Sequence, residues 1–242
     1  MKVGGHEIFT GGTRDRLDPG AVLAHDLSTN QVRQVYRPDQ GVVLDFAVSP
    51  SAKLVAVLQQ ILEVDVPARD ATVQLPNGRF VHEWRGLRVL TAAGSQIAET
   101  IPLVRHFVWS PDSNQMAYVV DRYQGLYKED ADQSVWIWNA ADKRSRKIRD
   151  GAHHVSWARF DGNLYPLELA DGAASQVLRV NAATGSIEKM THRSIYFSPS
   201  GEYYYGEVGR GPQVDVYLRA SDRPLKETSR TLSSLDGFAP IA

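Results

Sequence analysis

A short pattern recurs along the chain and decides its fold. It reads Phe46-Ala-Val-Ser-Pro-Ser-Ala-Lys-Leu-Val-Ala-Val57, then Val108-Trp-Ser-Pro-Asp-Ser-Asn-Gln-Met-Ala-Tyr118, then Tyr196-Phe-Ser-Pro-Ser-Gly-Glu-Tyr-Tyr-Tyr205, with a degenerate fourth copy at Val155–Tyr165. Each copy is an apolar strand, a turn and a second apolar strand. Proline fixes φ in such a turn, and Ser or Asp can accept a hydrogen bond from a neighbouring backbone N–H. The pattern therefore predicts four β-hairpins.

A second repeated element is an apolar strand, a small polar turn and a more polar strand. Its turns lie at 26–31, 91–96, 139–144, 181–186 and 219–224. There are five turns of this second kind but only four of the first kind, so we expect the N-terminal unit to lack a first strand. The segment Leu235–Ile241 resembles Leu44–Pro50, and we expect it to supply that strand.

These repeats predict one all-β domain over residues 1–242, a five-bladed β-propeller of four-stranded antiparallel blades. Pairing of the N- and C-terminal strands would close the ring, which leaves only short protected edges. Five blades average about 48 residues each, close to a typical propeller repeat. The expected blades are 6–37, 43–101, 103–150, 152–190 and 193–230, with 232–242 completing the first.

The Ser-Pro hairpins and the turn Asn181-Ala-Ala-Thr-Gly185 resemble the repeats of TolB-like propellers. The segment Val135-Trp-Ile-Trp-Asn139 also resembles the third strand of a WD repeat, with Asn139 where that motif has Asp, although the Trp-Asp pair is missing. The resemblance runs from about Glu7 to Arg230 and implies the propeller fold. It implies little about function, because such repeats occur in scaffolds, transport accessories and the gating domains of peptidases.

Composition excludes several function classes. The 27 basic and 28 acidic residues give a net charge of −1, which argues against nucleic-acid binding through phosphate neutralisation. The chain has no cysteine, so thiol nucleophiles and thiolate metal sites are excluded. No apolar stretch approaches the roughly 18 residues of a membrane span, and the first residues lack the apolar core of a signal peptide. We expect a cytoplasmic protein, with an exported mature fragment as the alternative.

Polar residues recur where the innermost strand of each blade begins. The position three residues before Val48, Trp109, Trp157 and Phe197 holds Asp45, His106, His154 and Ser194. Two histidines and a carboxylate at a channel mouth suit a divalent metal or a small polar ligand. We expect that these residues are generic repeat residues that cap strand edges, and keep the metal or small-ligand site as the alternative. His153 would point away from His154 in a straight strand.

Catalytic motifs are weak in this sequence. A five-bladed glycoside hydrolase would need two carboxylates across the cavity, for which only Asp45 and Asp236 are candidates. The nucleophile-elbow pattern Gly-x-Ser-x-Gly is absent. We therefore expect no catalytic residue, no cofactor and no enzymatic activity, and keep the glycosidase as an alternative.

Two long loops, Glu63–Val81 and Asp121–Gln133, interrupt the regular repeats. Asn77-Gly78 in the first loop indicates a small β-excursion. Regular blades need only short turns, so extra surface on one face is typical of binding. We expect a non-enzymatic scaffold whose protein partner contacts this face, at residues Trp84, Asp121, Tyr123, Tyr127, Glu129 and Asp130. The basic run Lys143–Arg149 is expected to be a solvated blade edge, with an acidic partner as the alternative.

Overall fold

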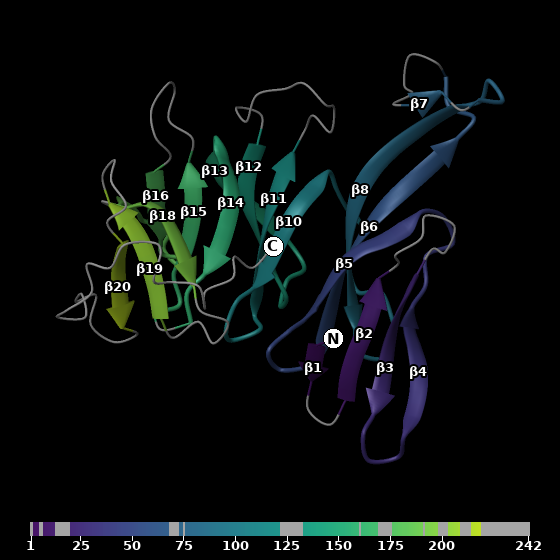
Figure 1. Cartoon of the computed structure of the whole chain (residues 1–242), viewed down its shortest axis with the longest axis horizontal. Helices are drawn as coiled ribbons and strands as arrows, with labels where there is room; N and C mark the ends of the chain where they lie inside the picture. The colour runs from purple at the N-terminus through teal and green to yellow at the C-terminus, as the bar shows by residue number, and fades with distance from the viewer. Residues whose placement is uncertain are drawn as a thin grey trace.

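The computed structural model contains strands and turns, and no helix, over the residues that it describes (Figure 1). These residues are 2–4, 7–12, 20–67, 73–74, 76–121, 133–159, 161–168, 176–190, 192–197, 203–208 and 214–218. Their strands form five antiparallel sheets that follow one another in chain order. The prediction of an all-β chain is therefore confirmed.

The first, third and fourth sheets each have four strands in sequence order, which the repeats predict for the third and fourth. The first sheet contains β1 (Lys2–Gly4), β2 (Glu7–Gly12), β3 (Ala21–Asp26) and β4 (Gln31–Tyr36). The third contains β10 (Val104–Trp109), β11 (Gln115–Asp121), β12 (Gln133–Asn139) and β13 (Ser145–Asp150). The fourth contains β14 (Ala152–Trp157), β15 (Leu164–Glu168), β16 (Gln176–Val180) and β17 (Ile187–Lys189).

The second and fifth sheets depart from this plan. The second contains β5 (Val42–Val48), β6 (Leu54–Val64), β7 (Val73–Gln74), β8 (Phe80–Thr91) and β9 (Ile101–Pro102), and both β7 and β9 pair with β8. The fifth contains β18 (His192–Phe197), β19 (Tyr203–Val208) and β20 (Val214–Leu218). Strands β6 and β8 extend past β5 as a long ribbon, which projects from the body with β7 near its tip (Figure 1). The small β-excursion predicted at Asn77-Gly78 is confirmed, because β7 pairs with β8 across that turn.

The Ser-Pro turns that begin at Ser49 and Ser110 form as predicted, and the third, at Ser198, lies outside the described residues. The backbone N–H of Ser49 donates to Leu54 O, and that of Ser110 donates to Gln115 O, both within 2.9 Å. Three residues into each turn the backbone is left-handed, with φ of 59° at Ala52 and 66° at Ser113. Strand β5 thus turns directly into β6, and β10 into β11.

The apolar runs alternate between two inter-sheet cores. On β11, Met116 and Tyr118 pack toward the second sheet, with Leu58 and Leu87. Their neighbours Ala117 and Val119 pack toward the fourth sheet, against Val155 and Leu178. Successive side chains of a strand point to opposite faces, so a continuous apolar run indicates a strand with cores on both sides.

The repeated aromatic position also packs between sheets, as predicted. Trp109 is buried against the second sheet, and its indole N–H donates to Ala47 O at 3.0 Å. The ring of Phe197 lies 5.3 Å from that of Tyr165 in the fourth sheet. Trp157 is buried in the core between the third and fourth sheets.

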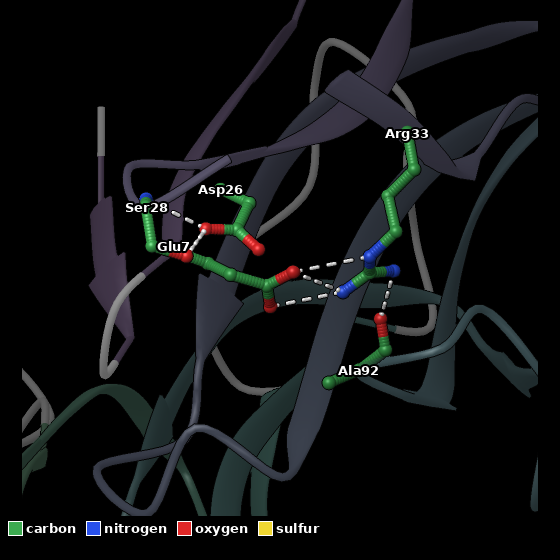
Figure 2. A network of polar contacts seen from close by, with 5 residues as sticks. All are labelled: Glu7, Asp26, Ser28, Arg33 and Ala92. Carbon is green, nitrogen blue, oxygen red and sulfur yellow. Dashed lines mark hydrogen bonds and ion pairs between the residues drawn. The ribbon is translucent and has the colours of Figure 1, made fainter. Parts of the chain in front are cut away.

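An arginine on the outermost strand of one sheet reaches a turn of the next (Figure 2). Arg33 of β4 binds both carboxylate oxygens of Glu7 at 2.9 Å and donates to Ala92 O at 2.6 Å. Arg146 of β13 donates in the same way to Ala182 O. Ala92 and Ala182 occupy the same place in the second repeated turn.

The expectation of a missing first strand is wrong. Residues Lys2–Gly4 form β1, which pairs with β2 and occupies the first position of the first sheet. A strand of three residues beside two glycines carries no alternating apolar pattern, so the sequence did not reveal it. The segment 232–242 lies outside the described residues. No pairing among the described strands joins the first and fifth sheets, which lie far apart in Figure 1.

Candidate functional site

A β-bulge precedes the candidate site residue on four successive inner strands. The pairing register shifts between Val43 and Asp45 on β5 and between Val104 and His106 on β10. The same shift occurs before His154 on β14 and before Ser194 on β18. A bulge bends a strand and re-aims the side chain that follows it, and bulges are frequent beside active sites. The sequence alignment of these four residues therefore corresponds to a repeated backbone feature.

The structure brings two of the predicted residues into contact. The imidazole rings of His106 and His154 stack with their centroids 4.8 Å apart and their planes 14° from parallel. The Nε2 atom of His106 lies 3.1 Å from Val155 O. Because a carbonyl can only accept a hydrogen bond, Nε2 carries the proton and Nδ1 of a neutral His106 is left as an acceptor. His154 is solvent-exposed, so the stack has one inner and one outer imidazole.

Asp45 completes the group from the second sheet. Its Oδ1 accepts a hydrogen bond of 2.8 Å from the backbone N–H of Phe46, and its side chain is exposed. Burial lowers the pKa of His106, although the hydrogen bond to Val155 O and the charge of Asp45 oppose this. The charge of Arg105 adds to the lowering. His106 is therefore neutral near pH 7.

The stacked rings do not suit a shared metal ion. In-plane nitrogen lone pairs of two parallel rings point side by side, whereas zinc ligands converge on one point about 2.0–2.1 Å from each nitrogen. Among the residues that the structure describes, no group of three or more His, Cys, Asp or Glu side chains could hold a metal. His153 lies in the bulge of β14, so the alternation of side chains in a straight strand does not apply to it. Its side chain lies outside the described residues.

A second polar group borders the site at the start of the third sheet. Asp121 ends β11, and its Oδ2 accepts 3.1 Å from Gln133 Nε2 and lies 3.7 Å from Arg105 Nη1. Gln133 is buried, and its Oε1 has no hydrogen-bond partner among the residues that the structure describes. Asp121 is a predicted surface residue for a partner, and within its own sheet it contacts Gln133 and Arg105; its role toward a partner stays a prediction.

The other predicted surface residues are only partly described. Trp84 lies on β8 in the projecting ribbon, half-buried, and its indole N–H donates to Glu63 Oε1 at 3.0 Å. Tyr123, Tyr127, Glu129 and Asp130 lie outside the described residues. The ribbon therefore holds Trp84 through a contact of its own.

Most of the basic run on β13 serves the fold. Arg146 reaches the fourth sheet, Arg149 binds Glu168 of β15, and Lys147 binds Asp150 and lies over the Trp136 ring. An acidic partner for this run stays an untested alternative. Among the described residues no helix has the length and apolarity to cross a membrane.

Comparison with solved structures identifies the fold. Oligogalacturonate lyase from Vibrio parahaemolyticus matches at 14% identity and a TM-score of 0.55, over 82% of this chain and 57% of that chain. A prolyl endopeptidase matches at 13% identity and a TM-score of 0.62, over 93% of this chain and 34% of that chain. The β-propeller domain of the Trilobed protease from Pyrococcus furiosus matches at 12% and 0.52, over 79% and 59%. No protein-family model matches the chain, and no curated protein matches it.

These matches correct one expectation. The expectation of a non-enzymatic scaffold is contradicted, because the similar structures are a lyase and peptidases rather than scaffolds. At 12–14% identity the likeness itself shows the fold, which is that of a β-propeller. The chain spans between 34% and 59% of the lengths of these three proteins.

Proposed function

We propose that this chain is the β-propeller of an enzyme and that its substrate contacts the inner-strand site at Asp45, His106 and His154. The similarity to propellers of a lyase and of peptidases supports an enzymatic setting. In this proposal the five sheets are five blades of a propeller related to TolB-like repeats. The inner strands β5, β10 and β14, which contact one another in turn, line the substrate side.

The single observation that carries the proposal is the stacked imidazole pair beside a bulge on each strand. A bulge leaves a backbone irregularity that the regular repeat does not need. Four blades keep it at the same position, and two of them place an imidazole there. The equivalent position of the fifth sheet holds Ser194, so the repeat itself does not require an imidazole at this position.

The chemistry open to this group is proton transfer. Imidazole and carboxylate are the side chains most used as general acids and bases near neutral pH. The exposed His154 is placed to exchange a proton with a substrate, and His106 holds its ring by stacking. Asp45 supplies a second acceptor from the neighbouring strand. No Gly-x-Ser-x-Gly element occurs in this sequence, so a serine nucleophile would have to come from elsewhere.

Activity assays with the full chain test this proposal. The substrates are oligogalacturonates, proline-containing peptides and N-acylated peptides, which the names of the similar enzymes suggest. We expect turnover of at least one of them, and a decrease of kcat/KM of about 100-fold in His154→Ala, as for loss of a general acid or base. Asp45→Asn should lower kcat/KM as well.

Matched controls lie outside the site. Asp142→Asn removes an exposed carboxylate from the turn before β13, and His25→Ala removes a histidine of the first sheet. Both should keep the activity of the unaltered protein. Equal activity of His154→Ala and His25→Ala would contradict the proposal, and so would the absence of turnover of every substrate class.

A further inference from the structure

We propose that the β10–β14 side of this site binds an oxyanion, a carboxylate or a phosphate, through Arg105 and His154. The inference rests on the proposed function in one respect: the anion would be a group of the substrate. It goes further by naming the charge of that substrate and the side of the site that recognises it.

Arg105 is available for an anion. It occupies the bulge of β10, and its side chain is 49% exposed. Its acidic contact among the described residues, Asp121 Oδ2, lies 3.7 Å away, which is longer than a charge-assisted hydrogen bond of about 2.7–2.9 Å. Asp121 also accepts from Gln133 Nε2, so it keeps a partner if Arg105 turns to a ligand. A planar guanidinium matches the two oxygens of a carboxylate or phosphate.

His154 offers a second donor on the same side. It is exposed and held in place by the His106 ring, which is fixed in turn by its hydrogen bond to Val155 O. Strand β10 packs against β14, so the sheets that carry Arg105 and His154 adjoin. An imidazole N–H donates to an oxyanion whether the ring is neutral or protonated.

The described bulge residues differ between β5, which has Leu44, and β10, which has Arg105. The bulge positions on β5, β10, β14 and β18 hold Leu44, Arg105, His153 and Arg193. Of these four, the structure describes the side chains of Leu44 and Arg105, and both are exposed. Leu44 is followed by Asp45, whose carboxylate lies on β5, and Asp121 at the end of β11 places a second carboxylate 3.7 Å from Arg105. An anion is therefore expected at Arg105 and His154 rather than beside Asp45, and it would compete with Asp121 for Arg105.

Equilibrium binding to the full chain tests the inference. The probes are trigalacturonate, which carries carboxylates, its neutral methyl ester, and pyrophosphate. We expect trigalacturonate or pyrophosphate to bind at least about tenfold more tightly than the ester, with an affinity that falls as salt is added. The preferred probe of the two charged ones identifies the oxyanion as carboxylate or phosphate.

Two substitutions should move the affinity in opposite directions. Arg105→Gln should weaken binding of the charged probe about tenfold, because a charged donor is lost. Asp45→Asn should tighten it about threefold, because a like charge near the anion is removed. Arg144→Gln, at an exposed position on the turn before β13, is the matched control and should leave the affinity unchanged. Arg105→Lys keeps the charge and gives an intermediate affinity if Arg105→Gln fails to fold.

The outcomes separate this inference from the proposed function. Binding of neither charged probe, equal binding of the ester, or equal weakening by Arg105→Gln and Arg144→Gln would overturn the anion site. Tight anion binding with no turnover of any substrate would support the anion site and contradict the enzymatic proposal. Turnover of an uncharged substrate without anion binding would support the enzymatic proposal and contradict the anion site.

Discussion

Two junctions between neighbouring sheets can be compared: the first with the second sheet, and the third with the fourth. Both contain the same arginine contact, but the backbone packs more closely in the first. In both, an arginine of the outermost strand donates to an alanine carbonyl in the next sheet's turn. Arg33 is also anchored by Glu7 in its own sheet, whereas Arg146 has no such carboxylate among its described contacts (Figure 2). The outer rim thus follows the repeat.

A glycine in each of the two turns shows the difference in fit. Gly94 has a φ of +96°, and a Cβ added to it would lie 2.4 Å from Val35 O of β4. Gly185 has a φ of +76°, and its added Cβ would come no closer than 3.7 Å to Arg146 Nη1. The first junction brings backbone against backbone, while the second meets only the end of a flexible side chain. The tolerance of each junction to substitution should follow from this.

The largest effect is expected for alanine at Gly94. Gly94→Ala combines a left-handed backbone with a clash against a carbonyl oxygen, and we expect a loss of about 3 kcal/mol in the free energy of unfolding. Gly185→Ala meets only the conformational cost, about 1–2 kcal/mol. Urea denaturation of both variants measures the difference. Equal losses of unfolding free energy in the two variants would mean that the first junction relieves the clash at Gly94 by moving apart, and would contradict its closer packing.

A smaller effect is expected for the arginines. Arg33→Ala removes hydrogen bonds between a charged donor and both Glu7 and Ala92, and we expect a loss of about 2 kcal/mol. Arg146→Ala removes the contact with Ala182 and should lose about 1 kcal/mol. The thermal midpoints of the two variants rank them, with Arg144→Ala as a control for an exposed arginine that should stay within about 0.5 kcal/mol of the unaltered protein. A greater loss for Arg146→Ala would reverse the comparison.

The smallest effect concerns the turn beside the first junction. The side-chain hydroxyl and backbone N–H of Ser28, with that of Thr29, lower the pKa of Asp26 to about 2 (Figure 2). A lowered pKa in the folded state means that the carboxylate contributes stability above its ordinary pKa of 3.8, and that this contribution is lost as the pH falls toward about 2. The stability difference between the unaltered protein and Asp26→Asn should therefore shrink over that interval.

Titration of the Asp26 carboxyl by NMR measures this directly. Ser28→Ala removes the largest cause of the shift and should move the pKa of Asp26 back toward 3.8. An unchanged pKa in Ser28→Ala would show that the backbone donors alone set it.

The predictability of the fold varied from element to element. The Ser-Pro hairpins were predictable because proline and a local hydroxyl act within a few residues. Strand β1 was missed because Lys2–Gly4 has no apolar alternation, and its place is decided by pairing with β2. Ring closure was inferred from the likeness of 235–241 to 44–50. Such a likeness does not show which strand of the first sheet lacks a neighbour, and β1 already occupies the first position there.

The site was predictable as a set of positions, and its geometry was not. Aligning the repeats found Asp45, His106 and His154 together with Ser194. The stacking of two imidazoles, and with it the poor fit to a shared metal, depends on how the third and fourth sheets approach one another. The bulges were invisible in the sequence, because a bulged residue is signalled by register with a partner strand rather than by its own type. Arg105 was missed for this reason.

The sequence alone determined the all-β class, the repeat and the inter-sheet position of its aromatic residues, because alternation along a strand and turn chemistry act over a few neighbouring residues. The tertiary structure alone decided which repeat positions meet. It set His106 on His154, Arg33 on Ala92 and Gly94 against Val35, each across more than forty residues of chain. Such contacts depend on the angle and spacing of packed sheets, which are set by the whole core and not by any local stretch.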